Sequence, residues 1–345
     1  MSLMWNEIME QPESLRRCLD ANYLKIKEFV RFIKKSELDL ICIAARGTSD
    51  HAGLFAKYVF EIANGIPISL SAPSVTTVYE GKIKYKNTLM IGISQSGMAE
   101  DVIEVMRHGR KQSCITVGIT NDCNSPIAKE ATYHFSCEAG LEKSVAATKT
   151  FLAQMLILSI ISAEWADDHA KLEQLFKLPD LVAKTLLTSE EVKTKTERYR
   201  YIDECFVLAR GVNYAIALET ALKIQETSYV RARGYAISDF YHGPFAMLEK
   251  GMPVIVFIPK GSIYSHVLEM VAKLKEVGAE MIIISNDDKA LELGSTAFRI
   301  PDTANDEIAA FLNIVITQQF ACQLAILKGN DPDHPRGLNK VTITK

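Results

Sequence analysis

The stretches "CIAARGTSDHAGLFAKYVFE" (42–61) and "CFVLARGVNYAIALETALKIQE" (205–226) decide the fold of this chain. Each begins as an apolar strand, passes through Ala-Arg-Gly and a polar turn, and continues as a helix. Arg46-Gly47 in the first stretch corresponds to Arg210-Gly211 in the second. A buried strand that turns directly into a helix is the building block of a parallel sheet. The recurrence predicts two similar α/β halves of about 160 residues each.

Apolar runs alternate with helical patterns through both halves. Short, nearly continuous apolar runs are expected of strands that are buried on both faces, and we predict such strands at 38–45, 87–94, 113–120, 132–137, 204–209, 252–259 and 280–286. Helical periodicity predicts helices between them at 49–64, 98–112, 145–165, 213–230, 266–278 and 307–328. The predicted fold is α/β: two doubly wound parallel-sheet subdomains, each a flavodoxin-like three-layer sandwich.

Five segments follow from this alternation. We expect an N-terminal helical segment over 1–34, a first α/β domain over 35–165 and a polar, helical linker over 166–200. A second α/β domain over 201–329 and a C-terminal tail over 330–345 complete the chain.

Composition excludes several classes of protein. The 345 residues carry 39 basic and 42 acidic side chains, without the basic excess of a nucleic-acid binder. The start, MSLMWNEIMEQPE, lacks the pattern of a secretory leader. The apolar stretch 151–166 is interrupted by polar residues and is too short to span a bilayer. Seven scattered cysteines without a CxxC pair indicate reduced core thiols. We expect a cytoplasmic protein without nucleic-acid or membrane partners.

Two loops could bind an anion. "RGTSD" (46–50) and "SQSGM" (94–98) each follow a predicted strand and precede a helix. Ligands of open parallel sheets bind beyond the carboxyl ends of the strands, and helix N-termini attract anions. Helix capping requires the same residue types, so either loop alone is ambiguous. Two such loops on neighbouring strand ends favour a small phosphorylated metabolite, with Ser94, Gln95 and Ser96 as the phosphate cradle. Neither loop matches a dinucleotide or P-loop motif.

The stretch 221–248 holds the residues best suited to chemistry. Lys223 and Glu226 lie three positions apart, so both project from one helix face. An isolated pair of this kind is ordinarily a solvated ion pair. The segment that follows is expected to be a long polar connection, and it holds a lone His242 before Gly-Pro. That histidine is equally well interpreted as a turn residue or as a functional one.

Six ordered motifs resemble the sugar isomerase (SIS) family: "RGTSDHAG", "SQSGMAED", "VAATKTF", "ALKIQETSY", "YHGPFAM" and "DPDHPRGLNKVTIT". Within it they are most similar to the isomerase part of glutamine–fructose-6-phosphate aminotransferases. The resemblance runs in the same order over essentially the whole chain. It implies two SIS subdomains, a phosphorylated sugar as substrate, no cofactor and no metal.

The resemblance also implies a role for each matching residue. Glu226 matches the base that moves a proton between C1 and C2, and His242 matches the ring-opening acid/base. Lys340 matches the lysine that forms an imine with the open-chain ketose, and Lys223 matches a lysine near the reactive end of the sugar. The substrate-binding positions are Gly47, Thr48, Ser49, Ser94, Gln95, Ser96, Ala99, Val145 and Ala146. In that family the histidine comes from a neighbouring subunit, which implies a homodimer with shared active sites and a C-terminal tail over each site.

Some positions depart from the aminotransferase pattern. Arg46 stands in place of a small thiol, and Ala99 replaces a threonine, which removes one hydroxyl from the phosphate loop; the charge of Arg46 could compensate. Gln225 and Asn339 also differ. The aminotransferases begin with a glutaminase domain whose N-terminal cysteine attacks glutamine. Here the first cysteine is Cys18, so we expect that glutamine is not the nitrogen source.

Three functions remain open. The leading interpretation is an isomerase/deaminase that converts glucosamine 6-phosphate to fructose 6-phosphate and ammonia. A deglycase that splits a 6-phosphorylated fructosamine or glucosamine-type adduct needs the same residues and more room around the amine. A sugar-phosphate sensor without turnover is the third. The histidines are dispersed, and none lies with cysteines or carboxylates at metal-ligand spacing.

Overall fold

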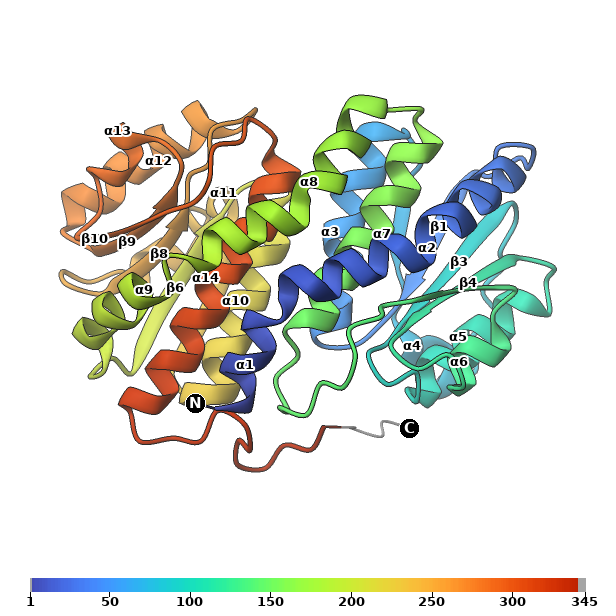
Figure 1. The fold of residues 1–345 in the computed structure, drawn as a ribbon, viewed down its shortest axis with the longest axis horizontal. Coiled ribbons are helices and arrows are strands. Elements are labelled where there is room, and N and C mark those ends of the chain that lie inside the picture. Colours follow the sequence, from blue (N-terminus) through green and yellow to red (C-terminus); the bar gives the residue numbers. More distant parts are fainter. Residues whose placement is uncertain (1, 341–345) are drawn as a thin grey trace. The chain divides into compact units, whose positions relative to one another are not determined.

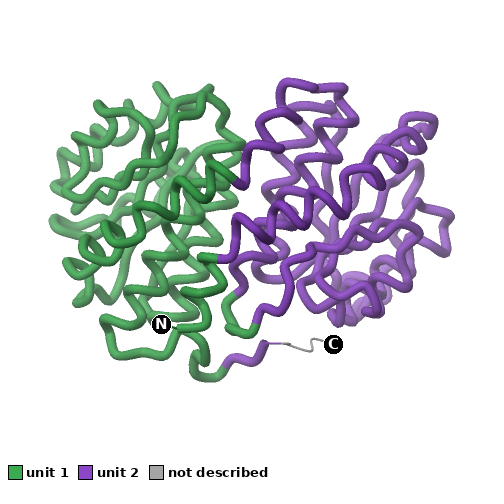
Figure 2. Tube along the Cα trace, viewed as in Figure 1, with its two compact units in different colours: residues 1–9, 143–146, 180–337 green, residues 10–142, 147–179, 338–345 purple. Residues whose placement is uncertain are grey.

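The computed structural model describes residues 2–340, which form two compact units. Unit 1 contains residues 2–9, 143–146 and 180–337 (green in Figure 2). Unit 2 contains residues 10–142 and 147–179 together with 338–340 of the tail (purple in Figure 2). The last five residues of the expected tail, 341–345, lie outside the described residues.

Unit 2 is built on a five-stranded sheet whose strands pair in parallel (Figure 1). The order β2-β1-β3-β4-β5 is the flavodoxin-like one, with the direction of winding changing between β1 and β3. The strands are β1 (Leu40–Ala44), β2 (Ile68–Leu70), β3 (Thr88–Ile93), β4 (Ile115–Thr120) and β5 (Tyr133–Ser136).

Helices cover both faces of this sheet. Gly53 of α3 approaches Ile43 of β1 on one face, while Cys42 and Met90 pack with Val102 of α5 on the other. Alternate strand residues point to opposite faces, so the unit has three layers. Its helices are α2 (Gln11–Ile33), α3 (Thr48–Ala63), α4 (Pro73–Thr77), α5 (Glu100–Arg110), α6 (Pro126–Glu130) and α7 (Lys149–Trp165).

Helix α7 is the central helix of unit 2. It is buried from Lys149 to Glu164 and packs on α2 and α3. Its apolar residues therefore fill the core, which explains why hydrophobic positions occur all around the helix. The helix begins at Lys149 rather than near the predicted Val145, because residues 143–146 belong to unit 1.

Unit 1 repeats the same topology. Its strands are β6 (Glu204–Ala209), β7 (Arg231–Ala236), β8 (Pro253–Phe257), β9 (Glu280–Ser285) and β10 (Thr296–Arg299). They pair in parallel in the order β10-β9-β8-β6-β7. Read from β7, this order places the second strand of the unit first, then the first, third, fourth and fifth strands, as in unit 2. The predicted fold class, two doubly wound parallel subdomains related as a pseudo-repeat, is confirmed.

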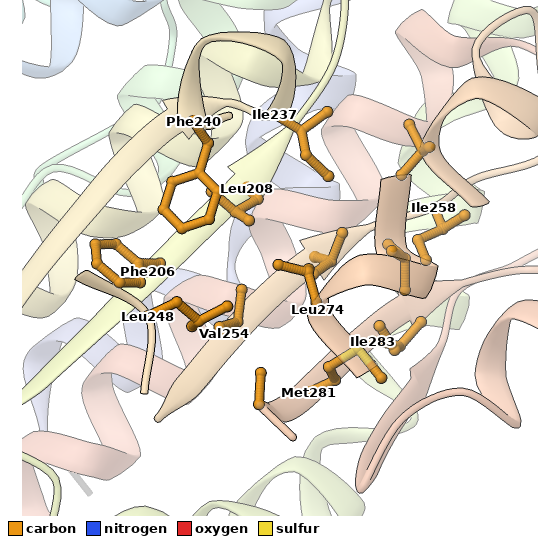
Figure 3. Close-up of a cluster of buried hydrophobic side chains, with 14 of the residues drawn as sticks. Phe206, Leu208, Ile237, Phe240, Leu248, Val254, Ile258, Leu274, Met281 and Ile283 are labelled. Carbon is orange, nitrogen blue, oxygen red and sulfur yellow. The ribbon is translucent and has the colours of Figure 1, made fainter. Parts of the chain in front are cut away.

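One face of the unit 1 sheet is covered by a continuous hydrophobic cluster (Figure 3). Phe206 and Leu208 of β6 meet Phe240, and Leu274 of α12 packs in the same cluster as Ile283 of β9. All five side chains are buried. Full burial of such side chains stabilises the fold by about 1.5–3 kcal/mol each.

The remaining elements of unit 1 are mostly helical. They are α1 (Leu3–Met9), α9 (Ser189–Thr196), the 3₁₀ helix η1 (Glu197–Tyr199), α10 (Asn213–Ser228), α11 (Ile237–Phe240), the 3₁₀ helix η2 (Pro244–Met247), α12 (Tyr264–Val277), α13 (Asp288–Leu291) and α14 (Asp306–Leu327). Helix α8 (His169–Leu186) contains Pro179, the last residue of its unit 2 portion. Within residues 2–340, α14 is long and apolar enough to cross a membrane, and 83% of its most apolar window is buried inside the protein.

The prediction of a long polar connection after Glu226 is wrong. Arg231–Ala236 forms strand β7, and α11 follows it directly. β7 is an edge strand, on which Arg231 and Arg233 are exposed and Ala232 between them is buried. Such a strand is polar because one of its faces is solvated, and its short alternation is easily mistaken for a loop.

Candidate active site

The two predicted phosphate loops lie at the winding reversal of unit 2. Residues 46–50 follow β1 and residues 94–98 follow β3, and these two strands are hydrogen-bonded neighbours. The carboxyl ends of β1 and β3 are where ligands bind in sheets of this topology. Arg46 Nε lies 2.6 Å from Asp101 Oδ2 in the first turn of α5, so an ion pair ties the first loop to the helix that follows the second.

The Arg46–Asp101 pair limits what Arg46 can offer a phosphate. The Asp101 side chain is 1% exposed, whereas that of Arg46 is 49% exposed. A buried carboxylate at this distance offsets much of the guanidinium charge. The hydroxyls and N–H groups of the loops therefore carry more of the expected anion binding than Arg46 does.

The turn 94–97 is held by two hydrogen bonds to its own serine side chains. Ser94 Oγ accepts a hydrogen bond from Gly97 N–H at 3.1 Å, and Ser96 Oγ accepts one from Met98 N–H at 3.3 Å. Each hydroxyl keeps its own proton for donation. Gly97 has φ +68°, and a Cβ there would lie 2.2 Å from Ser125 Oγ, so glycine is required at this position.

The serines of this loop do not cap a helix. The N-cap residues of α3 and α5 are Gly47 and Ala99, and neither supplies a side-chain acceptor. Thr48 is the first residue of α3, and buried Ser49 accepts a hydrogen bond from Gln154 Nε2 at 3.1 Å. Both helix N-termini therefore point their positive dipole ends at the same edge of the sheet without a side-chain cap from the N-cap residue, which favours an anion there.

In unit 1, helix α10 carries a buried row of charges. Lys223 Nζ lies 2.5 Å from Glu226 Oε2 and 3.4 Å from Glu219 Oε1. Glu219 and Lys223 are 0% and 1% exposed, while Glu226 is 21% exposed. Burial alone would lower the pKa of Lys223, but the two carboxylates raise it well above its ordinary value. Lys223 is therefore an ammonium that holds Glu226 at the surface of the helix.

Glu219 is the residue of this row that the sequence analysis missed. Its signal was present, because Glu219, Lys223 and Glu226 follow helical spacings of four and three. Only the burial of Glu219 and Lys223 distinguishes the row from a solvated ion pair. A buried ion pair needs both partners, since removal of one leaves an uncompensated charge.

His242 lies on the turn between α11 and the 3₁₀ helix η2. The residue is exposed, and its imidazole forms no hydrogen bond or ion pair within residues 2–340. Gly243 after it has φ +154°, which favours glycine, and Pro244 begins η2. An exposed imidazole on a turn is available to a group outside its own chain.

Val145 and Ala146 belong to a short segment of unit 1. Val145 N–H donates to the carbonyl of Asp333 at 3.2 Å, and Ala146 is fully buried. The preceding Ser144 donates its hydroxyl to the carboxylate of Glu7 on α1. These contacts hold the segment as an irregular stretch with bends at 144–146 instead of the predicted first turn of a helix.

Lys340 is the last described residue and belongs to unit 2. Its Nζ lies 3.3 Å from Oε2 of Glu142, a carboxylate that is fully buried, whereas the Lys340 side chain is 24% exposed. The sequence analysis missed Glu142. The two residues are 198 positions apart, and no local pattern links them.

Two cavities, one in unit 2 and one in unit 1, are lined by none of the predicted site residues. One of about 530 Å³ lies at the amino ends of strands β1, β3 and β4, and one of about 440 Å³ lies beside the edge strand β7. Among residues 2–340, no group of three or more His, Cys, Asp and Glu side chains is arranged to hold a metal ion.

Comparison with known proteins places the chain in a family. The SIS domain matches residues 36–162 and 201–328. The chain is 34% identical, over 99% of its length, to a glutamine–fructose-6-phosphate aminotransferase (isomerizing) of Aquifex aeolicus, and it spans 57% of that relative's length.

Solved structures agree in fold. The C-terminal domain of glucosamine-fructose-6-phosphate aminotransferase from Francisella tularensis superimposes with a TM-score of 0.88 at 29% identity, covering 97% of this chain and 98% of that one. Glucosamine-6-phosphate deaminase from Thermotoga maritima, at 23% identity, shares the fold with a TM-score of 0.79, covering 99% of this chain and 100% of that one. These similarities define a protein of the phosphosugar-isomerase type. The chain belongs to the SIS domain family.

Proposed function

We propose that this chain catalyses aldose–ketose isomerisation with deamination of an amino-sugar phosphate. Glucosamine 6-phosphate and water are converted to fructose 6-phosphate and ammonia. The observation that carries the proposal is the buried row Glu219, Lys223 and Glu226 on α10. Two fully buried charges beside a partly exposed carboxylate are costly to keep in a fold, and such constellations concentrate at functional sites.

Glu226 has the properties of the base. It is the most exposed member of the row, and Lys223 fixes its carboxylate in one orientation. In this proposal Glu226 takes the proton from C2 of the open-chain amino sugar and returns it at C1. A positioned general base of this kind contributes about 10²–10⁴ in rate.

The other residues supply binding, ring opening and the imine. Ser94, Gln95 and Ser96, with the N-termini of α3 and α5, hold the phosphate. His242 transfers the proton that opens the sugar ring. The proton transfer leaves nitrogen as an imine at C2. Lys340 replaces the nitrogen at that carbon, which releases ammonia, and water then returns the lysine and leaves the ketone.

The proposal includes a homodimer. The exposed position of His242, with its imidazole unpartnered in the described chain, supports its donation to the substrate of a neighbouring subunit. Two-fold dimers are the commonest assemblies of soluble proteins.

The proposed function is tested with a panel of substrates. The purified protein is incubated with glucosamine 6-phosphate, glucosamine, and a lysine adduct of fructose 6-phosphate, while ammonia, lysine and sugar phosphate are measured. We expect ammonia and fructose 6-phosphate in equal amounts from the first compound and none from the second. Release of lysine alone would replace the deaminase with a deglycase, and binding without turnover would identify a sensor.

A further inference from the structure

The carboxylate of Glu142 is engaged through both of its oxygens. Oε1 accepts the N–H groups of Thr148 at 2.8 Å and of Thr150 at 3.3 Å. Oε2 accepts the hydroxyl of Thr150 at 2.7 Å, and Lys340 Nζ lies 3.3 Å from it. One side of the carboxylate therefore faces a helix and the other faces the C-terminal tail.

The helix side of Glu142 explains why this carboxylate is ionised. Helix α7 begins at Lys149, and its N-cap Thr148 gives no side-chain cap, so Glu142 supplies the negative charge at this N-terminus. Burial alone would raise the pKa of Glu142, but the Lys340 ammonium and the hydrogen bonds from Thr150 and Thr148 lower it below its ordinary value. A carboxylate held in this way is a poor acceptor for a proton from Lys340.

Neighbouring titratable groups are occupied or neutral. Lys149 Nζ donates to Glu10 Oε2 at 2.5 Å and to the Leu141 carbonyl at 2.8 Å. Burial, with the charges of Glu142 and Glu138 adding to it, raises the pKa of the Cys137 thiol, which is neutral at physiological pH. Glu142 thus faces the tail lysine, while the Glu10 carboxylate faces Lys149.

We propose that Glu142 is a positioning residue for Lys340: its Oε2 holds the lysine nitrogen in place in the free protein and releases it when a sugar carbonyl binds. We call this contact between Glu142 and Lys340 the seat. The inference rests on the proposed function, which makes Lys340 the amine that forms the imine. The ammonium first loses a proton to solvent. The neutral amine then adds to the ketone carbon, and the carbonyl oxygen leaves as water when the C=N bond forms.

The seat has a consequence for pH. Glu142→Gln removes the anionic partner of the lysine nitrogen that forms the imine. Loss of an opposite charge beside an amine favours its neutral form, so we expect imine formation to move to lower pH in this variant. A purely structural role of Glu142 would change the amount of folded protein but would leave this pH profile where it is.

The test is reductive trapping of the imine. The full-length protein is mixed with fructose 6-phosphate and borohydride, which delivers hydride to the C=N carbon, and the covalent adduct is followed by intact mass between pH 6 and 10. The variants are Glu142→Gln, Lys340→Ala and, as a matched control, Glu10→Gln, whose carboxylate faces Lys149. Thermal melting reports folding of each variant.

We expect trapping in the wild type, none in Lys340→Ala, and a profile displaced to lower pH in Glu142→Gln but not in Glu10→Gln. If Glu142→Gln does not fold, Glu142→Asp keeps the charge but draws it away from Lys340, and a displacement in the same direction is expected. Trapping in the wild type with superimposable profiles in the Glu142 variants overturns the seat and leaves the proposed function standing. Failure of the wild type to trap fructose 6-phosphate overturns the imine role of Lys340, and the seat with it.

Discussion

The ammonium of Lys223 lies 2.5 Å from the carboxylate of Glu226, and a second carboxylate, that of Glu219, lies 3.4 Å away on the buried side. The lysine is 1% exposed and Glu226 is 21% exposed. The arrangement ties the most accessible carboxylate of α10 to a charge that cannot leave the core. Glu226 is consequently held in one orientation before any substrate arrives, which is what a general base requires.

Lys223→Met should cost about 3–5 kcal/mol of folding stability, because it removes the buried cation that lies 3.4 Å from the fully buried Glu219 carboxylate. It should also lower turnover, since Glu226 loses its anchor. Urea unfolding and ammonia release measure the two effects. Lys193→Met is the matched control: Lys193 pairs with Glu190 at the surface of the same unit, and its loss should cost about 1 kcal/mol or less. Equal losses in the two variants would contradict the account.

Ser94→Ala and Ser96→Ala should raise KM for the phosphorylated substrate about 10-fold or more each, with kcat little changed, because a hydrogen bond to a charged group is worth about 1.5–3 kcal/mol. Ser36→Ala, in the same unit but at the opposite ends of the strands, should leave KM unchanged. Steady-state kinetics with glucosamine 6-phosphate separate the two constants. A drop in kcat at constant KM would assign the serines a different role.

Mixing two inactive variants tests the sharing of His242 between subunits. Glu226→Gln and His242→Asn should each be inactive alone. If each site combines Glu226 of one chain with His242 of the other, a mixed dimer regains one complete site. Unfolding and refolding an equimolar mixture should then restore about a quarter of wild-type activity. No recovery, with mixed dimers demonstrated by mass spectrometry, would place both residues in sites of single chains.

Acid stability should depend on Glu142. The pKa of this carboxylate is lowered in the folded protein from its ordinary value of 4.5, so its stabilising contribution is complete above that pH and is lost as the pH falls through the lower folded value. The urea midpoint of the wild type should fall steeply below about pH 4.5. The urea midpoint of Glu142→Gln should be lower than that of the wild type at neutral pH and should fall less as the pH is lowered. Glu10→Gln is the control, because Glu10 pairs with Lys149 at the start of α7, the helix whose N-terminus Glu142 contacts. The urea midpoint of this variant should fall with pH as steeply as that of the wild type.

The fold was largely predictable from the sequence because parallel strands that are buried on both faces have nearly continuous apolar sequences. β6 matches its predicted range 204–209, and β3 lies within one residue at each end of 87–94. The edge strands β2, β7 and β10 were missed. An edge strand has one solvated face and few residues, so its pattern resembles a loop.

The candidate site was predictable only where it is local. The loop at Ser94 follows from a strand, a glycine and a helix start in direct succession, and the pairing of Lys223 with Glu226 follows from helical spacing. The seat of Lys340 on Glu142 joins residues 198 positions apart, and the restraint of Arg46 by Asp101 depends on two neighbouring strands. Such contacts depend on how the whole chain folds, and the sequence around each of the two partner residues does not reveal them.

The most direct test of the central claim is the rate of ammonia release from glucosamine 6-phosphate by the wild type and by Glu226→Gln, with Glu269→Gln on the exposed surface of α12 as control. The account predicts release matched by fructose 6-phosphate in the wild type and in Glu269→Gln. It predicts a loss of about 10²–10⁴ in Glu226→Gln, whose substrate binding is retained. A Glu226→Gln variant that releases ammonia within about twofold of the wild-type rate would contradict the account, since a general base contributes far more than that.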